Sequence, residues 1–480
     1  MSFPRYEHYK ESGVEWLGEV PVGWEVASLK RYFRIVGGST PKSDQEAYWD
    51  GEIIWVTPAD LSKLQSLYIN DSQRKITDNG LASCGASLVP ANSIILSTRA
   101  PIGSLAITDN EMCTNQGCKS LVPNNEADAK YYGYLLANSS TELNIRGKGT
   151  TFLELSGDEL GAFKIPLPPL PEQHTIAAFL DCETGKIDEL VAEQERLISL
   201  LKEKRQATIS IAVTKGLNPD APMKDSGIEW LGAVPVEWEV VRLKHISPFI
   251  AVGIVVNPSE YLSDEGLPFI YGGDIREGSI DYNGARRINF ENSKKNSKTI
   301  LRAGDLLTVR VGAPGVTAVV PSECDGGNCA SVMLVHQGDF DSQWLCYVMN
   351  NRVVRYQVEI VQYGAAQEQF NISHAVNFLI ITPPRQEQTT ISSFLDSETA
   401  KIDELVCEAR QAISLLKERR SALISAAVTG KIKVTDSDRS DSSDLSEGFC
   451  QTGSSEGLCQ TGLSEGFSQR DFSEEFRETP

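Results

Sequence analysis

The sequence has few of the patterns that mark membrane or metal-binding proteins. No apolar run approaches the roughly 20 residues that cross a bilayer, and the start, MSFPRYEHYK, lacks the apolar core of a secretory signal. The ten cysteines include no Cys-x-x-Cys pair, and the five histidines are scattered. These absences predict a cytoplasmic protein with no membrane partner, no metal site and reduced, structural thiols.

Familiar catalytic motifs are missing as well. No Gly-x-x-x-x-Gly-Lys-Ser/Thr phosphate loop occurs, and the Gly-rich stretches lack the strand–GxGxxG–helix setting of a dinucleotide site. The Asn/Asp-Pro-Pro-aromatic tetrad associated with adenine methylation is absent. The sole Pro-Asp pair, Pro219-Asp220, is not followed by the Asp/Glu-x-Lys of a nuclease centre. The sequence therefore predicts a chain that is not itself an enzyme.

Positive charge is scarce too. The formal net charge is −20, and no segment of the chain is strongly basic. A nucleic-acid-binding domain usually shows itself by a basic balance. Any contact with DNA must therefore come from local patches, or be shared with a partner that brings positive charge.

What the chain does contain is an internal repeat. Residues 171–217 return 215 positions later as residues 386–432, with 29 of 47 residues identical and no gap. A second shared block, ESGVEWLGEVPVGWEV at 11–26, recurs as DSGIEWLGAVPVEWEV at 225–240. The whole protein is thus predicted to be two copies of one unit, related by a pseudo-two-fold axis.

The longer shared block predicts two long helices with a narrow apolar seam. Each helix is acidic in its N-terminal half and basic in its C-terminal half. A parallel pair would place like charges side by side, so we expect an antiparallel coiled coil in which acid faces base. The predicted seam residues are Ile176, Leu180, Ile187, Leu190, Leu197, Leu201, Ile391, Leu395, Ile402, Leu405, Leu416 and Leu423.

The remaining sequence predicts two globular, mixed and β-rich domains, so the fold class is α+β. In the first domain, apolar runs at 53–56, 93–96, 104–107 and 120–122 are separated by turn residues, and one amphipathic helix is expected at 129–138. The predicted boundaries are 1–165 for the first domain, 166–224 for the central helix and linker, 225–382 for the second domain, and 383–433 for the distal helix. Residues 434–480, acidic and carrying nine-residue repeats, are predicted to be a disordered tail.

Several of these segments together resemble a known family. They are YKESGVEWLGEVPVGWEVASLK at 9–30, TRAPIGSLAI with CTNQGCKSLVP, IPLPPLPEQ with IAAFLD and KIDELVAEQERLISLLKEKRQA, and the closing AAVTGKI. The chain resembles, over residues 1–433, the specificity subunit of type I restriction–modification systems.

The resemblance implies two target recognition domains, each reading one half of a bipartite, asymmetric site in double-stranded DNA. It also implies two modification (methyltransferase) subunits that use S-adenosylmethionine, and restriction subunits that translocate DNA with ATP and Mg²⁺. No cofactor is expected in this chain. The helices would then fix the separation of the domains, and hence the spacer between half-sites.

Reading bases requires Arg, Lys, Asn or Gln side chains presented to a groove. The candidates for DNA binding are Arg99, Asn115, Gln116, Arg146, Lys148, Arg310, Asn328, Gln367 and Gln369. The candidates for phosphate contact are Arg74, Lys75, Arg286, Arg287, Lys294, Lys295 and Lys298. For each, an ordinary turn or solvated surface residue is the competing interpretation. The shared Trp16, Trp24, Trp230 and Trp238 are predicted to be structural, because the two copies keep them while their domains diverge.

Two alternatives remain open at this point. One is a modification-only or silent specificity subunit that serves as a reservoir of recognition domains for recombination. The other is a non-enzymatic coiled-coil scaffold with no role in DNA binding.

Overall fold

The computed structural model describes residues 3–64, 66–99, 101–148, 153–362 and 368–435. The chain forms two compact units, the first made of residues 1–187 with 418–480 and the second of residues 188–417. The predicted tail lies, from residue 436 onward, outside the described residues, as does the candidate Gln367. Within the described ranges, no helix is long and apolar enough to cross a membrane.

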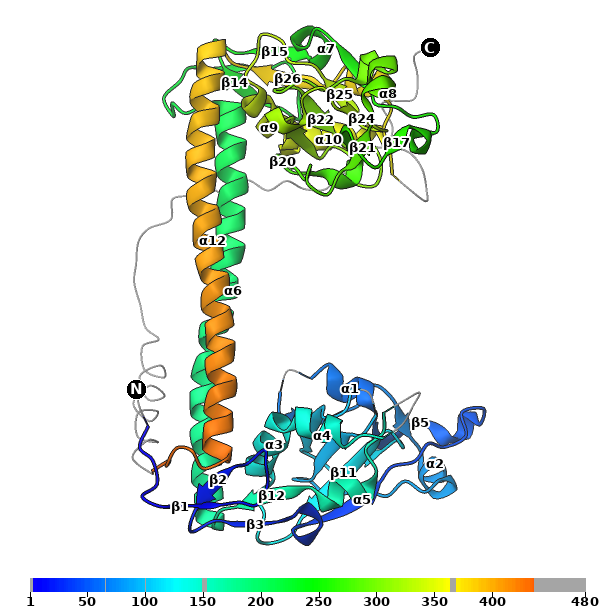
Figure 1. Cartoon of the computed structure of the whole chain (residues 1–480), viewed down its shortest axis with the longest axis vertical. Helices are drawn as coiled ribbons and strands as arrows, with labels where there is room; N and C mark the ends of the chain where they lie inside the picture. The colour runs from blue at the N-terminus through cyan, green and yellow to red at the C-terminus, as the bar shows by residue number, and fades with distance from the viewer. Residues whose placement is uncertain (1–2, 65, 100, 149–152, 363–367, 436–480) are drawn as a thin grey trace. The chain divides into compact units, whose positions relative to one another are not determined.

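The first unit contains a five-stranded sheet and a three-stranded sheet (Figure 1). The five-stranded sheet has the order β4 (Phe33–Gly37), β11 (Cys118–Pro123), β8 (Ile94–Ser97), β9 (Leu105–Thr108) and β6 (Tyr68–Ile69), antiparallel except for β6 with β9. The three-stranded sheet has the order β10 (Cys113–Thr114), β5 (Trp49–Val56) and β7 (Lys75–Ile76), with β10 parallel to β5.

Short helices and two-stranded ribbons complete the first unit. The helices are α1 (Pro58–Ser62), α2 (Asp78–Ser83), α3 (Ala129–Asn138), α4 (Ser140–Ile145) and α5 (Gly157–Ala162). The ribbons are β1 (Tyr9–Glu11) with β2 (Glu19–Pro21), and β3 (Glu25–Ser28) with β12 (Lys164–Leu167). The helix expected at 129–138 is confirmed as α3, and the four predicted apolar runs lie in β5, β8, β9 and β11.

The second unit repeats this plan with shorter strands. Its sheets are β16 (Ile250–Val252), β25 (Met333–Val335), β22 (Leu306–Thr308) and β23 (Thr317–Val319), and β17 (Leu262–Ser263), β21 (Arg286–Ile288), β18 (Leu267–Ile270) and β24 (Asn328–Cys329). Its ribbons are β13 (Met223–Asp225) with β14 (Ala233–Pro235), β15 (Glu239–Arg242) with β26 (Leu379–Thr382), and β19 (Ile275–Arg276) with β20 (Ser279–Ile280). Its short helices are α7 (Leu243–Ile246), α8 (Phe290–Lys295), α9 (Ser342–Asn350), α10 (Arg352–Val361) and α11 (Ile372–Ala375).

The two long helices are α6 (Leu170–Lys215, 46 residues) and α12 (Arg385–Val428, 44 residues). In the second unit the end of α6 meets the start of α12, because Ile209, Ala212 and Val213 share one core with Ile391 and Leu395. Farther along, Leu201 packs with Ile402 and Val406, and Arg205 lies 3.5 Å from Asp403. The helices therefore pair antiparallel and side by side, as their charge order predicted (Figure 1).

Three of the predicted seam residues lie outside this interface. Leu190, Leu197 and Leu405 are 45%, 42% and 46% exposed, whereas Leu201, Ile402 and Leu423 are buried. The observed seam on α12 runs through Ile402, Val406 and Ala409. The predicted alternation of 3- and 4-residue steps is correct. After Ile187 and Ile402, however, the next seam residue lies 4 positions later, where a step of 3 was predicted. Every second predicted residue is therefore one position too early. Leu416 is partly buried.

Each domain is attached to the helices by the same set of contacts. Trp24 Nε1 donates to Glu172 Oε2 at 3.1 Å, and Trp238 Nε1 donates to Glu387 Oε2 at 2.9 Å. Both indole rings are 1% exposed. Because a buried indole N–H needs an acceptor, the glutamate in the first turn of each helix fixes the shared block of its own unit.

A buried glutamine adds a second shared contact. Gln173 Oε1 accepts from the Asp128 N–H at 2.8 Å, and Gln388 Oε1 accepts from the Asp341 N–H at 2.9 Å. The two aspartates are the N-caps of α3 and α9. For Trp24 and Trp238, the prediction that the shared tryptophans are structural agrees with this junction. The first junction has one more contact, because the Tyr6 hydroxyl also donates to Glu172.

Candidate nucleic-acid interface

The loops at one edge of the first domain are tied together by backbone hydrogen bonds. The Ser39 N–H donates to Thr114 O at 2.9 Å, Thr98 N–H to Gly117 O at 2.8 Å, and Leu155 N–H to Thr98 O at 2.9 Å. Gly38 has no room for a Cβ, because Asn115 and Thr114 pack directly on it. We call these loops, residues 38–41, 57–60, 98–99, 114–117, 146–148 and 153–155, the loop edge of the first domain.

The second domain has an equivalent loop edge. The Ile254 N–H donates to Cys329 O at 2.9 Å, and Phe370 N–H to Arg310 O at 3.3 Å. Gly253, like Gly38, lies against backbone that leaves no space for a Cβ. The loop edge of the second domain therefore consists of residues 253–257, 271–274, 310–312, 329–331 and 368–370.

These matching bonds give the residue equivalences between the domains. Ile254 corresponds to Ser39 and Cys329 to Thr114, so Ala330 and Ser331 stand where the first domain has Asn115 and Gln116. By the same bonds Arg310 corresponds to Thr98, and the bridge between Val311 and Gln369 corresponds to that between Arg99 and Glu154.

The candidate Asn328 consequently does not correspond to Asn115. By these equivalences it corresponds to Cys113, which is also buried. Asn328 is 0% exposed and donates through Nδ2 to Thr299 Oγ1 at 2.9 Å and to Asn296 O at 3.2 Å. Its role in DNA binding stays a prediction, and in this structure its side chain is bonded inside the domain.

The other base-reading candidates lie on the loop edges. Arg99 Nη2 pairs with Glu154 Oε2 at 3.3 Å, and Lys148 Nζ pairs with Glu159 Oε1 at 2.5 Å. The Arg146 guanidinium lies 5.4 Å from the centre of the Phe163 ring. Arg99 and Lys148, some 50 residues apart in sequence, are thus brought to the same place, because both form backbone bridges with Glu154.

The remaining candidates divide into exposed and internally bonded groups. Gln116 is exposed and hydrogen-bonded to Thr40, whereas the Asn115 Oδ1 accepts from the Gly117 N–H at 2.9 Å and so shapes its own turn. In the second domain the Arg310 Nε donates to Phe370 O at 3.1 Å, and Gln369 is partly exposed.

Most of the phosphate-contact candidates are exposed, and several already have partners. Arg74 stacks 3.7 Å from the Trp49 ring centre and Arg286 4.3 Å from that of Tyr271. Lys75 pairs with Asp71 at 3.1 Å, and Lys295 with Glu291 at 2.8 Å. Exposed pairs of this kind are weak, so DNA phosphates can compete for these cations. Lys294 and Lys298 are exposed and Arg287 is partly exposed.

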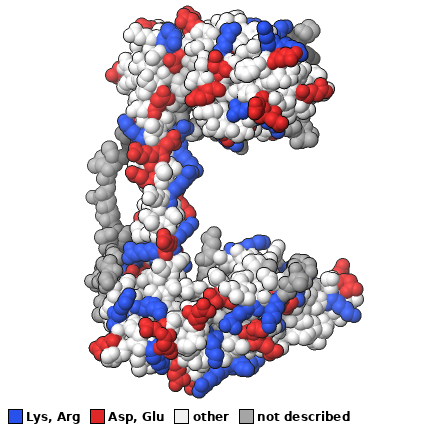
Figure 2. All heavy atoms as spheres, in the orientation of Figure 1, with Lys and Arg blue, Asp and Glu red and all other residues white. Residues whose placement is uncertain are grey.

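Basic and acidic side chains are mixed on the face of each unit that Figure 2 shows. Figure 2 shows basic and acidic side chains interspersed over the visible face of each unit, without a continuous basic field. This distribution agrees with the net charge of −20. Recognition by this chain would therefore depend on local contacts at the loop edges rather than on a long-range positive potential.

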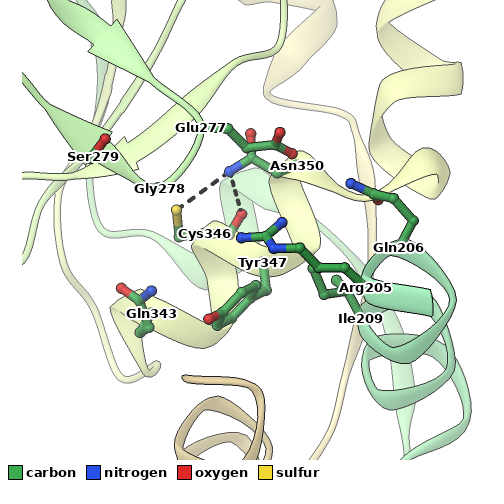
Figure 3. A pocket seen from close by; sticks show the side chains of 10 residues that line it. All are labelled: Arg205, Gln206, Ile209, Glu277, Gly278, Ser279, Gln343, Cys346, Tyr347 and Asn350. Atoms are coloured by element: carbon green, nitrogen blue, oxygen red, sulfur yellow. Dashed lines mark hydrogen bonds between the residues drawn. The ribbon is translucent and has the colours of Figure 1, made fainter. Parts of the chain in front are cut away.

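A cavity of about 170 Å³ lies in the second unit where the domain meets α6 (Figure 3). It is lined by Arg205, Gln206 and Ile209 of α6, by Glu277 to Ser279 of the β19–β20 turn, and by Gln343, Cys346, Tyr347 and Asn350 of α9. The Asn350 amide donates to Cys346 O at 3.0 Å. Burial raises the pKa of Cys346 to about 12, so its thiol stays neutral and is a poor nucleophile.

The other buried thiols are equally unreactive. Burial raises the pKa of Cys113 and of Cys118 to about 12. Among the described residues, no group of three or more His, Cys, Asp or Glu side chains is arranged to hold a metal ion. The loop edges are thus suited to binding by hydrogen bonds and ion pairs.

Comparison with known proteins agrees with this geometry. Residues 21–196 match the family model described as "Type I restriction modification DNA specificity domain". The chain is 27% identical, over 441 residues, to the specificity subunit of the type I restriction enzyme MjaIX of Methanocaldococcus jannaschii, covering 89% of this chain and 96% of that protein. The specificity subunit of the type I restriction enzyme EcoBI of Escherichia coli is 25% identical over 345 residues, covering 69% and 71% of the two chains.

Solved structures show the same fold. A chain from a type I R-M system, determined in work on its complex assembly and conformational transition, superposes with a TM-score of 0.66 at 19% identity, covering 85% of this chain and 98% of that one. The HsdS subunit from Thermoanaerobacter tengcongensis gives a TM-score of 0.54 at 20% identity, covering 86% and 98%. The resemblance found in the sequence is confirmed: residues 21–196 match the type I restriction specificity model, and proteins named as specificity subunits match the chain over most of its length.

Proposed function

We propose that this chain is the DNA-sequence specificity subunit of a type I restriction–modification complex, and that each domain reads one half of a bipartite, asymmetric site. The observation that carries the proposal is the contrast within the repeat. The junction residues Trp24, Glu172 and Gln173 recur as Trp238, Glu387 and Gln388, while equivalent loop-edge positions differ in chemistry. A protein that reads two different half-sites in one geometry requires this combination.

The long helices are proposed to join the two recognition domains and to receive the modification subunits. Both helices expose leucines. Leu190 on α6 is equivalent to Leu405 on α12, and Leu200 to Leu415. These four side chains and that of Leu197 are 42–58% exposed. Exposed apolar stripes on a helix favour contact with another protein. Because the same stripe occurs on both helices, it fits two copies of one partner. Restriction subunits would complete the endonuclease.

Catalysis is assigned to the partners. In this proposal the modification subunits bind S-adenosylmethionine and methylate adenine, and the restriction subunits use ATP and Mg²⁺. This chain contributes base recognition and positioning. Its DNA contacts would come from the loop-edge side chains Arg99, Gln116, Arg146, Lys148, Arg310 and Gln369, supported by phosphate contacts from the exposed cations.

The decisive experiment is to co-express the chain with its modification subunit and to map methylated adenines across the host genome. A bipartite motif with a constant gap is the expected result. A stable complex that leaves adenines unmethylated, or methylates them without a sequence motif, would contradict the proposal and favour a scaffold without a role in DNA recognition.

A further inference from the structure

Two adjacent valines project from the loop edge of the second domain. Val255 is 57% exposed and Val256 is 72% exposed. The next residue, Asn257, has a left-handed φ of 43°, and its Nδ2 donates to Glu260 Oε1 at 2.8 Å. The turn is therefore held by its own hydrogen bond, and it presents two apolar side chains to solvent without covering them.

Backbone hydrogen bonds of the neighbouring residues fix the position of these valines within the loop edge. The Ile254 N–H donates to Cys329 O at 2.9 Å, and the Ser331 N–H donates to Ile254 O at 3.1 Å. Ser331 itself has a φ of 60°, a conformation that a serine rarely adopts and that the surrounding bonds maintain. The valine turn thus lies beside residues 329–331, the segment equivalent to 114–116.

The first domain has different chemistry at the same place. By the backbone bonds given above, Thr40 corresponds to Val255 and Gln116 to Ser331, and in the first domain the Thr40 hydroxyl is hydrogen-bonded to Gln116. Threonine and valine have nearly the same shape, but only threonine can form a hydrogen bond. The first loop edge therefore has a hydrogen-bonded pair, Thr40 with Gln116, where the second has a valine that cannot form that bond beside Ser331.

The 5-methyl group of thymine is the apolar group that the bases present in the major groove, so an exposed valine side chain can contact it. Valine is suited to this contact, because its branched side chain has one strongly preferred rotamer and loses little entropy on binding. We propose that Val255 and Val256 contact the methyl group of one or more thymines in the half-site read by the second domain. This inference rests on the proposed function and specifies the ligand of that same site.

The test compares thymine with deoxyuridine, which lacks only the methyl group. After the motif has been mapped, exchanging residues 29–163 for another such domain identifies which half-site belongs to the second domain. Each thymine of that half-site is then replaced by deoxyuridine in a duplex, and the Kd of the complex with the modification subunit is measured. We expect at least one replacement to weaken binding about fourfold, since burying a methyl contributes ~0.8 kcal/mol and 1.4 kcal/mol is tenfold.

The variants assign the effect to the valines. In the double variant Val255→Ser with Val256→Ser, which removes the γ-methyl groups of both residues, the thymine and uracil duplexes should bind equally. The matched control is Val236→Ser, at another valine that is 45% exposed but lies in the shared block, and it should keep the fourfold difference.

Three outcomes would overturn the inference while leaving the proposed function intact. They are a second half-site without thymine, replacements that all change Kd less than twofold, and a fourfold difference that persists in the double variant. Absence of any methylated motif would overturn the proposed function, and this inference with it.

Discussion

The two copies of the repeat agree where their domains contact the long helices and differ at their loop edges. At the junction, Trp24 and Trp238 make the same hydrogen bond, within 0.2 Å of each other in length, to the first helical turn. At the loop edge, Thr40 and Gln116 give way to Val255 and Ser331. The contrast teaches that backbone geometry is kept in both places, while side-chain identity is kept only where it maintains the fold.

Replacing the whole first domain tests this division most strongly. The Leu29 N–H donates to Phe163 O at 2.8 Å, so the ends of residues 29–163 lie together and the segment can be exchanged without altering the β3–β12 pairing. We expect one half of the methylated motif to change completely and the other half to stay the same. Sequencing of methylated adenines measures the result, and a change in both halves would contradict the division of labour.

The next largest effect should come from the junction tryptophans. Trp24→Ala and Trp238→Ala should each lower the free energy of unfolding of their unit by ~3–5 kcal/mol, because each opens a cavity and removes a hydrogen bond to a glutamate. Urea denaturation followed by circular dichroism measures the loss. Trp230→Ala is the matched control, since its ring is 38% exposed and its removal should cost far less. A large difference between the first two variants would show that the junctions are not equivalent.

Asn328 and Gln116 should separate fold from recognition. Asn328→Ala should lower the free energy of unfolding by ~1–3 kcal/mol, because it removes two buried hydrogen bonds, and should leave the methylated motif unchanged. Gln116→Ala should do the reverse, changing the first half-site with little loss of stability. Thermal unfolding and methylation mapping of both variants test this pair, and an altered second half-site in Asn328→Ala would restore that residue as a candidate reader.

The smallest effect concerns one ion pair at the loop edge. Hydrogen bonding to Lys148 lowers the pKa of the Glu159 carboxyl below its ordinary value of 4.5. Its contribution to stability is therefore present above the ordinary pKa and is lost as the pH falls through the lowered value in the folded protein. NMR titration should show the Glu159 pKa rising in Lys148→Met, and an unchanged pKa would mean that the pair is not formed in solution.

The sequence predicted the elements of this fold well because they depend on local patterns. The repeat, the long helices, their antiparallel pairing and α3 follow from periodicity and charge order. The phase of the seam does not, since Leu197 and Ile198, or Leu405 and Val406, are equally apolar neighbours and only packing chooses between them. Arg99, Arg146 and Lys148 were selected individually, and their approach to one another depends on strand pairing that residue type does not reveal.

The loop edge of the second domain was the hardest part to predict. Asn328 was selected as a residue type that can read bases, while Ala330 and Ser331, which correspond to Asn115 and Gln116, carry no obvious signal. Val255 and Val256 also passed unnoticed, although two valines just before Asn257-Pro258 stand in a turn that has no core to enter. Hydrophobic residues next to turn residues are a signal that could have identified them.

The glycines that end the two long helices extend these findings to the history of the gene. Gly216 and Gly430 adopt left-handed φ values of 78° and 72°, and each lies against the tryptophan of the shared block, Trp238 and Trp24 respectively. The end of each long helix thus packs on the shared block at the start of a repeat. Either position can therefore accept a domain flanked by the same blocks. A DNA rearrangement that moved a domain from one position to the other would be expected to yield a folded protein whose half-sites appear in exchanged order, so new specificities could arise by transposition rather than by point mutation.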